Sequence, residues 1–233
     1  DFVKSSFERI GKIFADSEEI LGTESTERYR NKAQYPVAEQ NGKAVCGFYS
    51  KRSHRLTAFE DCLLQPEIFG KIAGCIIDYI NENKITAYNE ETGKGLLRHI
   101  YIRRGEHTGE IMVCLVVTNI KKCGKLYGVA GVLVKKFSDI VSIILNENSK
   151  NTNVIMGKKF SLLYGQDYIT DIMCGNKVKI SASSFYQVNT IQAERLYSLA
   201  EEYAGLKSDD ILLDLYCGAG TIGLSMANKV KKL

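Results

Sequence analysis

The chain has 233 residues, of which 45% are apolar and 25% are charged. This is the usual balance of a globular protein, and it excludes a disordered tail or a fibrous repeat. Lys and Arg outnumber Asp and Glu by 31 to 27, a net charge of +4 that suits nucleic-acid binding but equally suits ordinary solvated lysines. The longest apolar run, 111–117, is far shorter than the roughly 20 residues that cross a bilayer, so no membrane association is expected.

The first elements in chain order are a helix and a hairpin. Apolar residues recur at helical spacing over 2–14, which predicts a helix. Two strands are predicted over 31–39 and 43–49, joined by Asn41-Gly42, because both turn residues tolerate a positive φ. Pro66 opens a second helix, since its missing N–H costs nothing in a first helical turn.

From residue 97 onward the pattern changes to short strands with few helical crossovers. Such a run favours one antiparallel sheet over a doubly wound one. The strands are predicted at 99–103, 110–117, 141–145, 153–156, 160–164, 168–173 and 177–181, with a helix over 126–137.

The last part of the chain, from 183, differs in kind. Asn189 is expected to cap a helix that ends at Gly205, with Gln192 completing a capping box. The buried face of this helix is expected to consist of Leu196, Leu199, Ala200 and Tyr203. A nearly all-apolar segment, 211–216, is then predicted to be a parallel strand buried on both sides.

The predicted strand leads into Gly218, Gly220 and Gly223 and then a helix. Glycines allow the backbone to approach a ligand, and a helix N-terminus offers unpaired N–H groups. The spacing also matches the dinucleotide fingerprint, so a nicotinamide- or flavin-dependent enzyme remains one interpretation. A strand–helix turn without a ligand is another.

Seven cysteines are scattered along the chain without a C-x-x-C pair, and the N-terminus lacks the features of a signal peptide. This favours a cytoplasmic location and argues against both a disulfide framework and a self-contained zinc site. Most of these cysteines are expected to be reduced and buried, as at Cys75 and Cys114.

Three separated segments resemble one known family. They are 29–37 (YRNKAQYPV), 184–189 (SFYQVN) and 214–224 (DLYCGAGTIGL). In this order they resemble the RNA (uracil-5-)-methyltransferases of the RumA/TrmA type, in the branch that methylates 23S ribosomal RNA. The resemblance covers essentially the whole chain.

The resemblance implies a cofactor, a substrate and site residues. The cofactor is S-adenosyl-L-methionine, contacted by Gln187 and Tyr216, with Asp214 at the strand end. The backbone at Gly218 and Gly220 would pass close to the methionine moiety, with Thr221 at the helix start. The partner is RNA, with ribosomal RNA favoured and transfer RNA second. A non-catalytic RNA-binding module is the alternative from another class.

Two cysteines need separate interpretations. The family's nucleophilic cysteine lies in a later motif, so Cys217 is interpreted as a small packing residue although it precedes a helix. Cys62 matches the fourth ligand of the 4Fe-4S cluster found in some family members. The other three ligands lie before Asp1 in the family, so Cys62 is expected to be an orphaned ligand or a simple buried thiol.

Basic groups at Arg28/Arg30/Lys32, Lys51/Arg52/Arg55 and Arg103/Arg104 could follow RNA phosphates or could be solvated edges. His54, His99 and His107 show no spacing typical of a metal site.

The resemblance also indicates what the chain lacks. In the family a Cys thiolate adds to carbon 6 of uracil and a carboxylate later removes the proton from carbon 5; both belong to motifs after the last helix. The chain is therefore expected to be a fragment that binds S-adenosylmethionine weakly or not at all and is inactive alone.

The overall expectation is an α/β protein (α+β overall). Residues 28–182 form a central antiparallel-sheet domain, and 183–233 form the start of a class I Rossmann-like methyltransferase domain. Residues 1–27 form an N-terminal helix and connector that pack on the methyltransferase domain.

Overall fold

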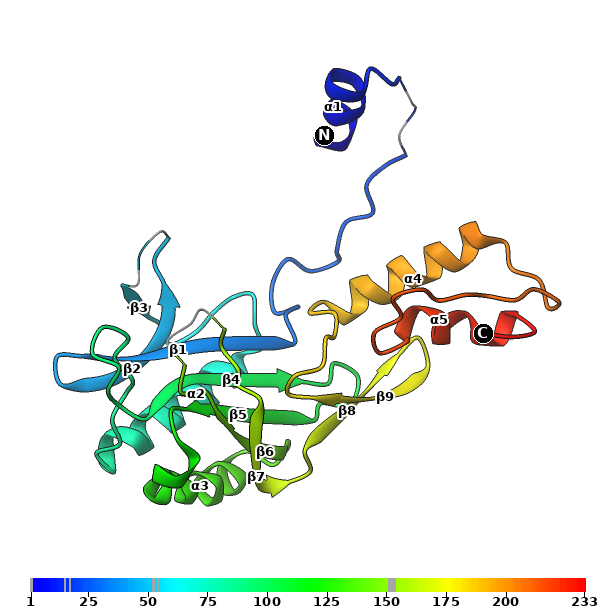
Figure 1. Ribbon diagram of the computed structural model, residues 1–233. Helices are drawn as coiled ribbons and strands as arrows, with labels where there is room; N and C mark the ends of the chain where they lie inside the picture. Colours follow the sequence, from blue (N-terminus) through cyan, green and yellow to red (C-terminus); the bar gives the residue numbers. More distant parts are fainter. Residues whose placement is uncertain (1, 15, 17, 52, 54, 151–153) are drawn as a thin grey trace.

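A seven-stranded sheet and a separate two-stranded hairpin organise the chain (Figure 1). The computed structural model describes residues 2–14, 16, 18–51, 53, 55–150 and 154–233. The strand order of the large sheet is β3-β2-β1-β4-β5-β6-β7, and the hairpin is β8-β9. The strands are β1 (Lys32–Gln40), β2 (Lys43–Tyr49), β3 (Leu56–Ala58), β4 (Leu97–Arg104), β5 (Ile111–Val117), β6 (Ile140–Glu147), β7 (Lys159–Gly165), β8 (Tyr168–Met173) and β9 (Asn176–Ser181).

Neighbouring strands of the large sheet pair antiparallel, except that β5 and β6 are parallel. Parallel neighbours need a crossover connection, and this one contains two short 3₁₀ turns and helix α3 (Gly128–Lys136). Every residue of β5 is buried. The all-apolar sequence of β5 therefore follows from its central position with both faces covered.

The two faces of the sheet are covered by different elements. Helices α2 (Glu67–Glu82) and α3 pack on one face and form the larger core with alternate residues of the strands. The opposite face carries a smaller core to which the hairpin, the segment after it and α4 (Thr190–Ala204) contribute. Its buried members are Tyr101, Met112, Cys114, Ile144, Ile169, Met173, Val178, Ile180, Ala182, Tyr186, Ala193 and Tyr197.

Most predicted elements between residues 31 and 181 are confirmed, including the turn at Asn41-Gly42, where both residues have positive φ. The sequence did not predict β3. Residue 153 of the predicted strand at 153–156 lies outside the described residues, and 154–156 form no strand. The mixed α/β class is confirmed, with the parallel β5–β6 pair and the separate hairpin as departures from a single antiparallel sheet.

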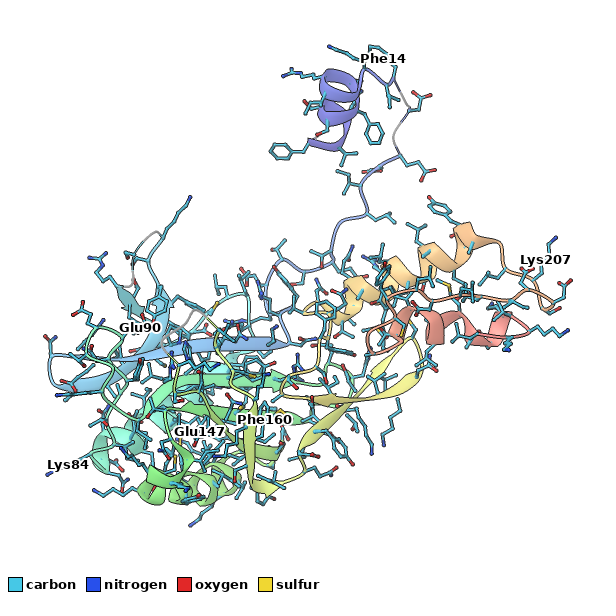
Figure 2. The ribbon with its side chains drawn as sticks, viewed as in Figure 1. Phe14, Lys84, Glu90, Glu147, Phe160 and Lys207 are labelled. Atoms are coloured by element: carbon cyan, nitrogen blue, oxygen red, sulfur yellow. The ribbon has the colours of Figure 1, made fainter. Side chains whose placement is uncertain are left out.

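The N-terminal helix is shorter than predicted. It consists of α1 (Phe2–Ser5) and a π-helical turn, η1 (Ser6–Gly11), and it ends because Lys12 adopts a left-handed conformation with φ of 55°. No residue of α1 or η1 is buried, and Phe14 lies away from the sheet and α4 (Figure 2). The connector, in contrast, reaches α4, because Gln192 and Arg195 donate hydrogen bonds to the carbonyls of Leu21 and Gly22.

Helix α4 begins and ends as predicted but presents a different face. The Asn189 side chain accepts from the Gln192 amide, and Gly205 adopts the left-handed conformation at the C-terminus. The Gln192 side chain bonds to the connector, so no capping box forms. The predicted buried face is wrong: Leu196 is 60% exposed and Tyr203 67% exposed.

The residues of α4 that are buried instead are Thr190, Ala193 and Tyr197. They contact the smaller core, which lies under the first half of the helix. Apolar content alone did not reveal this face, because the position of the smaller core selects it.

The predicted strand at 211–216 is not formed. One parallel bridge joins Ile211 to Lys232, with α5 (Thr221–Met226) between them, which is the connection of a βαβ unit. Leu213 and Leu215 are each 75% exposed, because no neighbouring strand pairs with them among the described residues. None of the helices in the described ranges combines the length and apolarity that a membrane crossing requires.

Asp171 connects the hairpin to the turn between β4 and β5. Its carboxylate is completely buried and accepts from the backbone amides of Glu106 and His107, at 3.0 and 2.9 Å. The Tyr186 hydroxyl donates to the same carboxylate at 2.9 Å. Burial and the neighbouring Asp171 charge both raise the pKa of Tyr186, so the phenol remains a donor.

We expect Asp171→Ala to lower the free energy of unfolding by about 2–4 kcal/mol, since two amides and a hydroxyl lose their acceptor in a buried place. Urea unfolding followed by circular dichroism measures this change. Lys177→Ala, at an exposed position on β9, is the control and should change stability by less than about 0.5 kcal/mol. Equal stability of the two variants would contradict the role of Asp171.

His99 on β4 makes folding sensitive to acid. Its side chain is 8% exposed, and burial, helped by the nearby Arg98 charge, lowers its pKa to about 4, while Glu90 acts in the opposite direction. The unfolded chain binds a proton near pH 6.5, whereas the folded chain does so only near pH 4. His99 therefore contributes no loss above about pH 6.5, and stability falls as the pH drops from there to about 4.

The expected loss from His99 is on the order of 3 kcal/mol over this interval. Urea unfolding at a series of pH values should show that the free energy of unfolding of the unsubstituted chain declines steeply over this interval. In His99→Gln the decline should be much shallower. His107→Gln, at a half-exposed histidine, should retain the decline. A native chain whose stability is constant between pH 6.5 and 4 would contradict the assignment.

Candidate functional site

Asn31 joins two of the segments that the sequence singled out. Its side-chain amide donates to the Gln187 carbonyl at 2.8 Å and to the Thr190 hydroxyl at 2.9 Å. Its backbone amide donates to the Val188 carbonyl at 2.9 Å. Asn31 is 1% exposed, so these bonds form in a place that water does not reach. They attach the start of β1 to the segment that leads into α4.

Gln187 lies at this junction and is half-buried. Its carbonyl is fixed by Asn31, while the next residues extend toward the Asn189 cap of α4. Phe185 and Tyr186, just before it, point in different directions: Phe185 is 77% exposed and Tyr186 is buried in the smaller core. The backbone of Gln187 is therefore held on both sides, which suits a residue that positions a ligand.

The glycine loop is organised around Asp214. One of its carboxylate oxygens accepts the backbone amide of Gly223 at 2.9 Å. A Cβ on Gly223 would lie 2.7 Å from that oxygen and 3.0 Å from the Leu233 side chain. Only glycine allows α5 to approach Asp214 this closely, which gives the third glycine of the motif a physical reason.

The other loop residues adopt left-handed conformations that shape an open turn. Tyr216, Gly218 and Gly220 have φ values of 61°, 57° and 74°, and Gly220 is the N-cap of α5. A Cβ at Gly218 would meet nothing within 4 Å. Tyr216 is fully exposed. The loop thus offers a carboxylate, glycine backbone amides and an exposed aromatic ring, which are groups that could bind an ammonium and a carboxylate.

The structure places the two parts of the predicted cofactor site along α4. The hydroxyl oxygens of Tyr197 and of Thr221, the first residue of α5, lie 3.5 Å apart. Tyr197 is about 12 Å along the helix from the Asn189 cap, at 1.5 Å per residue. The glycine loop therefore meets the middle of α4 at Thr221, while Gln187 precedes the N-terminus of α4 and lies beside the sheet.

Cys62 lies in a loop held by Arg28 and not by a cluster of thiols. The Arg28 guanidinium forms two 2.7 Å bonds with Asp61 and also donates to the Cys62 carbonyl at 3.0 Å. This guanidinium holds the pKa of Asp61 below its ordinary value. Cys62 is a half-buried free cysteine, and no group of three or more metal-ligating side chains gathers within the described ranges.

The prediction for Cys217 is wrong. Cys217 is exposed rather than packed, in a loop whose neighbours Tyr216 and Gly218 are also exposed. Cys75 and Cys114 are buried as expected. His107 contacts Glu194 on α4 at 3.0 Å, His99 is buried, and His54 lies outside the described residues.

The three basic groups separate into different environments. Arg28 is neutralised by Asp61, and Arg103 is buried at 2% exposure, so neither is a solvated phosphate contact. Arg30 and Lys32 remain half-buried at the start of the sheet. Arg52 lies outside the described residues.

Comparisons with known proteins identify the family. A protein named "Uncharacterized RNA methyltransferase YljE" from Lactococcus lactis subsp. lactis is 48% identical over 208 residues, which cover 89% of this chain and 45% of that protein. An RNA methyltransferase so named from Clostridium tetani is 42% identical over 231 residues, 99% of this chain and 50% of the relative. No family model matches the chain.

The chain belongs to this family of RNA methyltransferases. The resemblance to the RumA/TrmA type that the three segments carry is confirmed at this level. The chain spans about half the length of the curated relatives it matches.

A solved structure shows the same fold. The tRNA (uracil-54, C5)-methyltransferase of Pyrococcus abyssi, in complex with S-adenosyl-L-homocysteine, superposes with a TM-score of 0.77 at 22% identity. The superposition covers 97% of this chain and 52% of that one. The mixed architecture of a sheet followed by a helical segment is therefore shared with that structure.

Sequence reasoning missed the roles of Asn31 and Arg103. The sequence showed Asn31 only as one residue of the first segment of resemblance, and that membership was the one signal that it has a particular role. Arg103 was assigned to a basic edge, because nothing in one sequence reveals that its guanidinium is buried against the carbonyls of Ser181 and Ser184.

The contact between Gly223 and Asp214 predicts unequal effects of two alanine substitutions. Gly223→Ala should displace α5 from Asp214 and increase hydrogen exchange in α5, because its Cβ has no room. Gly218→Ala, the control, faces only the strain of its positive φ, about 1–2 kcal/mol. Mass-resolved hydrogen exchange measures both, and equal exchange in α5 of the two variants would contradict this packing.

Proposed function

We propose that the protein containing this chain methylates carbon 5 of uracil in RNA with S-adenosyl-L-methionine as methyl donor. The favoured substrate is 23S ribosomal RNA, as the resemblance implies, and transfer RNA is the second. Family membership supports methylation of RNA. The observation that carries the proposal is the Asn31 junction, which holds two separated segments of resemblance together in a buried hydrogen-bond network.

The residues present fit S-adenosylmethionine at its amino-acid end. Asp214 would accept from the ammonium, the backbone of Gly218 and Gly220 leaves space beside it, and Tyr216 offers an exposed ring. The amide of Gln187 would act from the junction beside the sheet. The cofactor supplies an electrophilic methyl group when bound.

The chain by itself is proposed to be inactive. In the family the thiolate and the base belong to motifs that this sequence does not contain, and Cys217 is not at the position of the family's nucleophile. Within the whole protein, this chain would contribute to holding the cofactor and positioning the RNA.

The test is transfer of labelled methyl groups from S-adenosylmethionine to RNA transcripts by the complete gene product. Gln187→Ala and Tyr216→Ala should each lower kcat/KM by about 10- to 100-fold, because a misplaced cofactor disturbs the reacting geometry. Gln166→Ala, in the exposed turn between β7 and β8, is the control and should retain activity.

The identity of the product tests methylation at carbon 5 of uracil, and the choice of substrate tests the preference for 23S ribosomal RNA. Digestion of the RNA and chromatography should yield 5-methyluridine, and 23S ribosomal RNA should accept more methyl groups than transfer RNA. RNA binding without methyl transfer to either RNA would favour the non-catalytic module. Another methylated nucleoside would overturn the assignment to carbon 5 of uracil.

A further inference from the structure

Three cations, Arg30, Lys32 and Arg103, lie near the first residue of β1. Lys32 on β1 lies directly opposite Arg103 on β4, and directly opposed residues of an antiparallel pair share one face of the sheet. Arg30 lies two residues before Lys32, just ahead of β1. No ion pair joins any of these three to an acidic residue in the described ranges, whereas Arg28 is bonded to Asp61.

Arg103 contributes a buried positive charge. Its guanidinium is 2% exposed and donates to the carbonyls of Ser181 and Ser184 at 2.6 and 2.8 Å. Its Nε atom is buried without a hydrogen-bond partner. The centroid of the Tyr101 ring lies 5.6 Å from its Cζ atom. Carbonyls and a ring solvate the cation but do not neutralise it, so its field extends toward Lys32.

Lys32 responds to that field. Burial lowers the pKa of its ammonium, and the charges of Arg103 and Arg30 lower it further. Three like charges in a partly desolvated place repel one another. This repulsion lowers the stability of the folded chain, and a bound anion would offset it. Lys32 and Arg30 are half-buried, so their end groups remain accessible to one.

The position of the cluster indicates which anion. Asn31 lies between Arg30 and Lys32 and is bonded to Gln187, and Arg103 is bonded to Ser184. The cations therefore border the segment that carries the proposed cofactor residue. An RNA that presents a base there brings its phosphates past the start of β1 and the end of β4, where these cations lie.

We propose that Arg30 and Lys32 form a phosphate-binding site for the RNA backbone, with buried Arg103 supplying the field that keeps the site selective for an anion. This inference rests on the proposed function for the identity of the polyanion. A phosphodiester between the two accessible cations offsets their repulsion, and it holds the RNA beside the 184–188 segment without reading its sequence.

The salt dependence of RNA binding tests the site. The complete gene product is titrated with a labelled single-stranded RNA at several KCl concentrations, followed by fluorescence anisotropy. Each phosphate contact contributes about 0.7 to the slope of log K against log salt for a single strand. Lys32→Gln and Arg30→Gln should each reduce the slope by about that amount, and the double variant by about twice as much.

Two further variants separate charge from folding. Lys32→Arg retains the charge and should restore the slope. Lys135→Gln, which removes an exposed lysine from α3 on the opposite face of the sheet, is the matched control and should leave the slope unchanged. An unchanged slope in Lys32→Gln and Arg30→Gln overturns the proposal, as does an equal loss in Lys135→Gln.

Protection of Lys32 from acetic anhydride, measured by mass spectrometry, distinguishes the possible anions. RNA should protect Lys32 at concentrations where inorganic phosphate and S-adenosylmethionine do not. Protection by S-adenosylmethionine alone would assign the cations to the cofactor carboxylate and overturn the proposal.

The outcome is independent of methyl transfer. A Lys32-dependent slope without any methylation would retain the site and reject the proposed function. Methylation together with an unaltered slope in both variants would support the proposed function and reject the phosphate-binding site.

Discussion

The buried hydrogen bonds of Asn31 are the constraint on which the arrangement of the chain depends. They connect the first strand of the sheet to the segment 187–190, which is more than 150 positions away in sequence. A buried amide without these acceptors would cost about 1–3 kcal/mol, so the two segments are held together by the penalty of separating them. Helix α4, and the glycine loop that contacts it at Tyr197, take their positions from this junction.

The face of the sheet opposite the helices carries most of the buried polarity. Asp171 binds the hairpin to the turn between β4 and β5, and Arg103 binds the segment after β9 to β4. The helix-covered face, in contrast, carries an apolar core that is mostly aliphatic. One face of the sheet therefore carries the apolar core, while the other carries cations without acidic partners in the described ranges. The proposed RNA contacts lie on this second face.

The glycine loop shows how a motif acquires a geometric meaning. Gly223 is needed because α5 approaches Asp214, Gly220 because it caps α5 with a positive φ, and Gly218 because the turn has a left-handed conformation there. The same G-x-G-x-x-G spacing serves dinucleotide sites, so the glycines alone do not select a cofactor. What favours S-adenosylmethionine for this chain is its membership of a family of RNA methyltransferases, and the contacts of Asp214, Tyr216 and Gln187 with that cofactor are part of our proposal.

The sequence alone determined most strands of the central sheet (though not β3), the Asn189 cap, the Gly205 end of α4 and the three family segments. These features depend on local periodicity, turn chemistry and motif order. Only the tertiary structure decided that α4 buries Ala193 and Tyr197, that Leu213 and Leu215 stay exposed, and that Cys217 is on the surface. It also decided that Arg103 is buried while Arg30 and Lys32 stay accessible. Burial depends on which elements meet across large sequence separations, and a pattern read along one chain does not contain that information.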